Sequence, residues 1–168
     1  MDALTRWYFA YGSNMQSDTL RRRRGIAPTT TLTARLPSYR LLFDIPVGPG
    51  LRGVANIAPQ RDSEIWGVLY GITPEQHEHL GRTEGVPAGL YRWLSVEVET
   101  LRGPMAAETL ISDRRESARL PSLRYRQILV DGAREHGLDA AWVAALENLE
   151  LAWDERVGAI NPPGARRR

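Results

Sequence analysis

Two stretches of the chain combine residue types that could do chemistry. The first is Tyr8-Phe9-Ala10-Tyr11-Gly12-Ser13-Asn14, in which an aromatic, β-prone run ends at Gly-Ser-Asn. Where a strand passes through such a turn into a helix, several backbone N–H groups point to one place beside the helix N-terminus. That arrangement suits a carboxylate, a phosphate or a developing oxyanion, although a plain strand–turn–helix junction would explain the same residues.

The second stretch is centred on Glu84, which lies between an expected helix end and the loop Gly85-Val86-Pro87-Ala88-Gly89. A loop beside a strand can hold a carboxylate inside a cleft, where it can act as a general acid or base. The alternative interpretation is a surface glutamate that caps a turn.

Three further patterns are better explained without a ligand. The stretch Gly48-Pro49-Gly50-Leu51-Arg52-Gly53 matches a dinucleotide fingerprint in its letters, but residues 54–57 are strand-like and no helix follows, so we expect a hairpin turn. In His77-Glu78-His79 the two histidines are two apart, so on a helix they face nearly opposite ways, and a solvated helix face is expected instead of a metal site. Arg21–Arg24 lack interleaved aromatic residues and are expected to be solvated near a helix end.

Composition excludes several classes of enzyme. The 168 residues contain no cysteine, and all 22 basic residues are arginine. Thiolate nucleophiles, iron–sulfur clusters, cysteine zinc sites, lysine Schiff bases and a P-loop lysine are therefore excluded. A net charge of only +2 is a weak reason to expect a nucleic-acid partner. No apolar run could span a bilayer and the N-terminus does not resemble a signal peptide, so we expect a cytoplasmic protein.

The elements that would position these residues follow from local signals. Strands are expected at residues 7–11, at 39–45, 53–57 and 64–72 as an antiparallel meander, and at 91–101 and 105–111 as a hairpin. Helices are expected at residues 15–24 with Asn14 as cap, 74–82, 122–135 and 140–151. Strands first and helices late indicate an α+β fold with a mainly antiparallel sheet. We expect one domain over residues 1–160, and a Pro/Arg-rich disordered tail over 161–168.

These stretches together resemble the γ-glutamylcyclotransferase family. The matching segments occur in the family's order over nearly the whole chain. They are Tyr8 to Met15, Ile65 to Tyr70, Glu84-Gly85-Val86 with Gly89 and Tyr91, Pro121 to Tyr125, and Gly132 to Leu138. One departure is visible: the family often has Leu-Asp before its Glu-Gly pair, where this chain has Leu80-Gly81-Arg82-Thr83.

The resemblance implies a small α+β domain with a twisted, barrel-like sheet and flanking helices. It also implies a cofactor-free reaction that releases 5-oxoproline and a free amine from a small γ-glutamyl amide, with glutathione metabolism as its setting. Neither a nucleic acid nor a membrane is implied as a partner. By the same resemblance Glu84 is the proton acceptor. The substrate-binding residues that it implies are Tyr8, Phe9, Ala10, Tyr11, Gly12, Ser13, Asn14 and Tyr125.

In such a reaction the substrate's own α-amine attacks its γ-carbonyl, so the enzyme needs no nucleophile and mainly holds a reactive conformer. A reference glutamate is about 3.5 pKa units more acidic than an α-amine, so a useful base must be buried. The backbone N–H groups of Gly12, Ser13 and Asn14 are expected to hold either the substrate's α-carboxylate or the tetrahedral oxyanion.

Two other functions remain open from the sequence. One is a non-catalytic module that binds a small carboxylate or modified amine in the same pocket. The other, ranked last, is an arginine-driven binder of anions or nucleic acid that uses Arg21–Arg24 and the tail. The leaving amine and the oligomeric state are not determined by the sequence.

Overall fold

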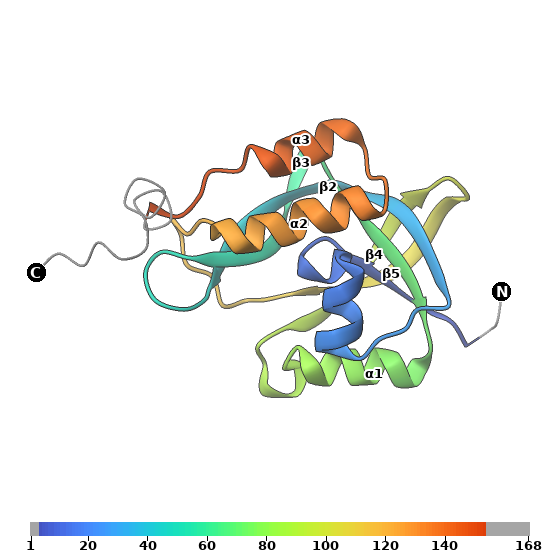
Figure 1. Ribbon diagram of the computed structural model, residues 1–168. Helices are drawn as coiled ribbons and strands as arrows, with labels where there is room; N and C mark the ends of the chain where they lie inside the picture. Colours follow the sequence, from blue (N-terminus) through green and yellow to red (C-terminus); the bar gives the residue numbers. More distant parts are fainter. Residues whose placement is uncertain (1–3, 154–168) are drawn as a thin grey trace, which may run out of the picture.

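The computed structural model describes residues 4–153 (Figure 1). The expected tail, residues 161–168, and the end of the expected domain lie outside the described residues. None of the helices within the described part of the chain is long and apolar enough to cross a membrane.

The described residues form a closed barrel with flanking helices, which confirms the α+β fold. The strands follow one another around the barrel in the order β1-β3-β2-β4-β5. They are β1 (Arg6–Ala10), β2 (Thr30–Pro46), β3 (Gly53–Ile72), β4 (Arg92–Thr100) and β5 (Gly103–Ile111). The helical segments are η1 (Ser13–Met15), η2 (Thr19–Arg23), α1 (Pro74–Thr83), η3 (Val86–Ala88), α2 (Leu123–Glu135) and α3 (Ala140–Glu147).

The expected three-stranded meander is wrong, because residues 53–57 and 64–72 belong to one strand, β3, which forms a long hairpin with β2. Residues 60–63 separate these two expected strands, but they lie inside β3 as a bulge. Pro37 pairs with Glu64 whereas Tyr39 pairs with Pro59, so these four residues lie opposite the single residue Ser38. A left-handed backbone at Ser38 and Asp62, with φ of 62° and 61°, accommodates the bulge. The first part of β2, residues 30–38, was missed.

The barrel closes where β1 meets its two neighbours. β1 runs antiparallel to β3 from Arg6↔Ile72 to Ala10↔Val68, and it meets β5 in parallel at Tyr8↔Glu108. Thr109 Oγ1 donates a 2.7 Å hydrogen bond to the Phe9 carbonyl across this closure. The end of β1, where the Gly-Ser-Asn turn begins, is therefore fixed by strands on both sides.

The core fills the barrel and the space beneath α2. Phe9, Ile65, Leu69, Leu80 and Leu129 are fully buried in one cluster. Burying a side chain of this size stabilises the fold by about 1.5 to 3 kcal/mol. Figure 1 shows α2 and α3 side by side on one side of the barrel and α1 on the other, with the segment after β1 between α2 and α1.

Three of the four expected helices begin after a capping residue. The capping box of Thr73 and Gln76 begins α1, Ser122 caps α2 and Asp139 caps α3. α3 ends at Glu147 instead of residue 151. The helix expected at 15–24 is wrong at its start, because the chain first makes the short 3-10 turn η1 and then a helical stretch that includes the π turn η2.

Candidate active site

A cavity of about 400 Å³ lies where the loop after β1, the end of α1 and the first turns of α2 meet. Its size is typical of small-molecule sites. Seven of the nine expected site residues line it: Tyr8, Tyr11, Gly12, Ser13, Asn14, Glu84 and Tyr125. The other two, Phe9 and Ala10, are buried in the core behind that wall.

Glu84 is held at the end of α1 as its C-terminal cap. Gly85 follows with a φ of 78°, a left-handed conformation that favours glycine and turns the chain away from the helix. The Glu84 side chain is only 10% exposed. Its Oε1 accepts a 2.8 Å hydrogen bond from Asn14 Nδ2 and lies 3.1 Å from Arg24 Nε. The structure therefore provides a buried carboxylate with a fixed orientation instead of a surface cap.

Asn14 connects three of the side chains in the cavity. Besides contacting Glu84, its Nδ2 donates to the Tyr8 hydroxyl at 3.0 Å, and its Oδ1 accepts from Arg24 Nε at 3.4 Å. The expected role of Asn14 as a helix cap is therefore wrong: Gly12 precedes the 3-10 turn, and no side chain caps it. With both ends of its amide engaged in the cavity, the side chain is not available to the backbone.

Arg24 corrects the expectation that Arg21–Arg24 are all solvated. Arg21, Arg22 and Arg23 are exposed, but the Arg24 side chain is 24% exposed and donates from Nη1 to the Thr83 carbonyl at 3.2 Å. It therefore contacts the last two residues at the end of α1. No feature of the sequence distinguishes this arginine from its three neighbours.

Phenol groups make up much of the cavity wall. Burial, and next the Glu84 carboxylate, raise the pKa of Tyr8, and the same two causes raise the pKa of Tyr91 to about 12. Burial is also the main cause that raises the pKa of Tyr11 and Tyr125. These groups therefore remain neutral hydroxyls near neutral pH and act as hydrogen-bond donors or acceptors.

The loop from Gly12 to Met15 is fixed from two sides. A Cβ atom added to Gly12 would lie 3.2 Å from the Tyr125 hydroxyl, so this close approach favours glycine. The Tyr70 hydroxyl lies 3.0 Å from the carbonyl oxygens of both Asn14 and Met15. A Cβ atom added to Gly132 of α2 would lie 2.7 Å from the Gln16 backbone nitrogen. The loop is therefore packed tightly against α2.

His77 also differs from the expectation of a solvated helix face. Its ring stacks on Trp93 with centroids 4.0 Å apart, and its Nε2 lies 2.9 Å from the Glu108 carboxylate. Burial lowers the pKa of His77. His79 is exposed, as expected for the opposite face. No group of three or more His, Asp or Glu side chains within residues 4–153 is arranged to hold a metal ion.

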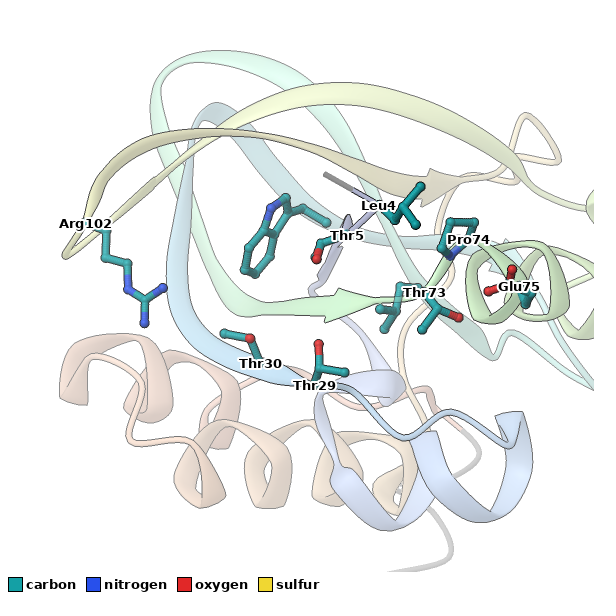
Figure 2. Close-up of a pocket in the computed structure, with 10 residues that line it drawn as sticks. Leu4, Thr5, Thr29, Thr30, Thr73, Pro74, Glu75 and Arg102 are labelled. Atoms are coloured by element: carbon teal, nitrogen blue, oxygen red, sulfur yellow. The ribbon is translucent and has the colours of Figure 1, made fainter. Parts of the chain in front are cut away.

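A second cavity, of about 440 Å³, lies beside the start of β1 and the start of α1. Figure 2 shows Thr5, Thr29 and Thr30 around it, with Arg102 at one end and Thr73, Pro74 and Glu75 at the other. None of the expected site residues lines this cavity. The carboxylate and the loop that could do chemistry are gathered in the first cavity.

Known proteins resemble this chain both in sequence and in structure. A model of the AIG2-like family matches residues 64–146. The human gamma-glutamylcyclotransferase is 31% identical over 148 residues, which cover 85% of this chain and 78% of the human protein. The gamma-glutamyl cyclotransferase aclK of Aspergillus oryzae is 26% identical, with 91% of this chain and 66% of that protein covered. A solved structure named gamma-glutamyl cyclotransferase superposes with a TM-score of 0.78 at 27% identity, covering 89% of this chain and 90% of that one.

Proposed function

This chain belongs to the γ-glutamylcyclotransferase family, and we propose from that premise that it converts a small γ-glutamyl amide to 5-oxoproline and a free amine. The observation that carries the proposal is the buried Glu84 carboxylate, oriented by Asn14 and Arg24 inside a cavity bordered by the Gly12–Asn14 loop. A binder of small carboxylates would be weakened by a buried anion beside its ligand, so this carboxylate favours an enzyme over a binding module.

The reaction needs one base that later becomes an acid. The substrate's α-amine loses a proton and attacks the γ-carbonyl carbon, a carbon–nitrogen bond forms the five-membered lactam, and the original amide bond breaks. Glu84 accepts the amine proton and returns it to the leaving nitrogen, so protons balance over the cycle. Both of its protein contacts are to Oε1, and within the described residues Oε2 accepts no hydrogen bond. We therefore assign proton transfer to Oε2.

Charge that develops on the γ-carbonyl oxygen needs hydrogen-bond donors. The Tyr125 hydroxyl accepts from the Ala55 backbone N–H at 3.1 Å and is also faced by the Ser13 N–H. An oxygen whose acceptor sites are used in this way directs its own hydrogen elsewhere, and Tyr125 lines the cavity. We assign Tyr125 as a donor to the substrate, with the N–H groups of Gly12 and Asn14 available for the α-carboxylate or the oxyanion.

The test is the formation of 5-oxoproline, detected by mass spectrometry. Purified protein is incubated with a panel of γ-glutamyl amino acids, γ-glutamyl amines and glutathione, alongside Glu84→Gln. We expect product from wild type and at least a hundredfold lower kcat in the variant, because the amide cannot accept the proton. Glu78→Gln is the matched control, since this exposed glutamate lies on the same helix and pairs with Arg82.

Two results would contradict the proposal in different ways. A Glu84→Gln variant as active as wild type would show that another group is the base. No product from any substrate, with the protein folded, would favour a binding module instead. Release of 5-oxoproline from glutathione itself tests the narrower proposal of a role in glutathione metabolism, which rests on the sequence resemblance. We also propose a cytoplasmic location, as expected from the sequence.

A further inference from the structure

The 400 Å³ cavity that contains Glu84 is called the catalytic cavity here. It adjoins a smaller hollow of about 190 Å³. The two share part of their walls, namely Arg23, Val47, Val54, Tyr125 and Ile128. Glu84 and Asn14 line the catalytic cavity but not the hollow. A molecule bound at Glu84 can therefore extend past Tyr125 into the hollow without leaving the protein surface.

The hollow is formed by two segments that are distant in the sequence. The loop between β2 and β3 lies beside the start of α2, where Gly53 N donates to the Leu120 carbonyl at 2.9 Å and Leu120 N donates to the Leu51 carbonyl at 3.1 Å. Figure 1 shows this loop reaching toward the first turn of α2. Arg23, at the end of η2, lines both the hollow and the cavity bordered by the loop from Gly12 to Met15, which we call the catalytic loop under the proposed function.

Two positive charges border this hollow without a negative partner. Among the residues that the structure describes, Arg23 and Arg124 are the charged ones that line it, and no aspartate or glutamate does. Both are exposed, and neither guanidinium has an ion pair or hydrogen bond within residues 4–153. The next arginine, Arg24, is instead committed to Glu84 and Thr83. Exposed arginines are often merely solvated, but these two line a hollow that shares part of its wall with the catalytic cavity.

The remaining wall is partly apolar. Val47, Val54 and Ile128 line both the catalytic cavity and the hollow. A ligand that fits this wall has an apolar body next to the reacting amide and an anionic group at its far end. Under the proposed function the γ-glutamyl half of the substrate lies at Glu84, so the group that reaches the hollow belongs to the leaving amine.

We propose that this hollow is the leaving-group subsite, and that Arg23 and Arg124 select γ-glutamyl amides whose leaving amine carries a negative charge, as a carboxylate or a phosphate. The proposal rests on the proposed function, and it names the class of amine released there. Neutral and cationic amines would leave both guanidiniums without a partner. Because the two arginines are exposed, their effect is selectivity of modest size that weakens as salt screens it.

The experiment keeps the γ-glutamyl half constant and changes only the charge of the leaving group. γ-Glutamylalanine is compared with γ-glutamylalaninamide, and γ-glutamyl-phosphoethanolamine with γ-glutamylethanolamine, by kcat/KM for 5-oxoproline release. The two pairs separate a carboxylate from a phosphate. We expect wild type to prefer the charged member of at least one pair, by a ratio that falls as NaCl is raised from 20 to 500 mM.

The variants test whether the two arginines cause this preference. Arg23→Gln and Arg124→Gln should each lower the charged-to-neutral ratio about fivefold, and the double variant should abolish it. Arg21→Gln is the matched control, since this exposed arginine precedes Arg23 in η2 and lines neither cavity. It changes the net charge equally and should leave the ratio as in wild type. Equal melting temperatures check that each variant is folded.

Three results would overturn the inference. If charged and neutral substrates lose activity equally in the two variants, the arginines serve the common γ-glutamyl half. If Arg21→Gln lowers the ratio as much, the effect is long-range attraction by net charge. If wild type releases 5-oxoproline from both members of each pair without preference, the subsite is wrong while the proposed function stands. Absence of 5-oxoproline from all four compounds would overturn the proposed function together with the subsite.

Discussion

A single carboxylate oxygen, Glu84 Oε1, receives contacts from two segments that are far from it in the sequence. Asn14 reaches it from the turn after β1, and Arg24 reaches it from the residue that follows η2. Arg24 also donates to the carbonyl of Thr83, the residue before Glu84. The cation therefore does two things: it pairs with the carboxylate, and it fixes the chain that carries it.

Removal of this cation gives the first prediction. Arg24→Gln should lower kcat/KM about tenfold, the scale of a lost charge-assisted hydrogen bond. Without the guanidinium the Glu84 carboxylate loses one of its two contacts, so its orientation toward the substrate is less fixed. The measurement is kcat/KM at pH 7.5, with the melting temperature as a check that the variant is folded.

Two further variants separate charge from general disruption. Arg24→Lys keeps the charge without the planar guanidinium that reaches both Glu84 and Thr83, so it should restore kcat/KM only in part. Arg22→Gln removes an exposed arginine that pairs with Asp18, and its kcat/KM should match that of wild type. A wild-type kcat/KM in Arg24→Gln would show that this cation is not needed to hold Glu84.

At the scale of elements, the position of the catalytic loop depends on its close packing against α2. An added Cβ at Gly132 would meet backbone atoms of Gln16 and Met15 at 2.7 and 2.8 Å, and backbone cannot move as a side chain can. Gly132→Ala should therefore destabilise the protein by about 1 to 3 kcal/mol, although alanine in an open helix position is favourable. Urea denaturation measures the change, and kcat should fall because the loop moves.

A second helical glycine provides the control for this prediction. The nearest atom to an added Cβ at Gly81 of α1 is Trp93 Nε1, at 3.3 Å, and it belongs to a side chain. Gly81→Ala should cost less stability than Gly132→Ala. The opposite order would mean that α2 can shift away from the loop at little cost.

The packing of α1 on the barrel should make stability depend on pH through His77. Burial holds the pKa of His77 below 6.5, with Glu108 and Arg6 facing its ring. The unfolded state then binds more protons than the folded state as the pH falls through about 6.5, so stability falls from pH 7.5 to pH 5.5. The lowered pKa values of Glu75, Asp113 and Glu135 act at more acidic pH.

Comparing variants isolates this contribution. The free energy of unfolding, measured by urea titration at pH 7.5 and 5.5, should drop less in His77→Gln than in wild type. His79→Gln removes an exposed histidine of the same helix and should retain the wild-type drop. An equal drop in all three proteins would show that His77 is not the cause.

Elements with local signals were predictable from the sequence, and those set by distant contacts were not. The capping box at Thr73 and the turn signal at Arg102-Gly103-Pro104 placed α1 and the β4–β5 hairpin, because their hydrogen bonds join near neighbours. The bulge at residues 60–63 has the composition of a turn, and its pairing is decided by Ser38 on another strand. Arg24 was missed for the same reason: its partners lie on α1 and in the β1 turn.

For the whole molecule, the geometry of the site and the integrity of the barrel both depend on the contact between β1 and β5 that closes the barrel. Tyr8 comes from β1, Glu84 from the end of α1, Tyr91 from just before β4 and Tyr125 from α2, so no single element contains the site. The closure between β1 and β5 holds the start of the catalytic loop through the Tyr11 hydroxyl, which donates to the Leu110 carbonyl at 2.5 Å. Activity should therefore be lost only when the barrel unfolds.

Thr109 tests this dependence. It is fully buried, and its hydroxyl donates to the Phe9 carbonyl across the closure at 2.7 Å. Thr109→Val keeps the shape but removes the donor, and should destabilise the protein by about 1 to 3 kcal/mol. Urea titrations followed by tryptophan fluorescence and by residual activity should coincide in wild type, and in the variant both midpoints should move down together. Thr31→Val, an exposed site in β2, should change stability by less than about 0.5 kcal/mol. Activity lost well before the fluorescence change would mean that the catalytic loop opens without the barrel.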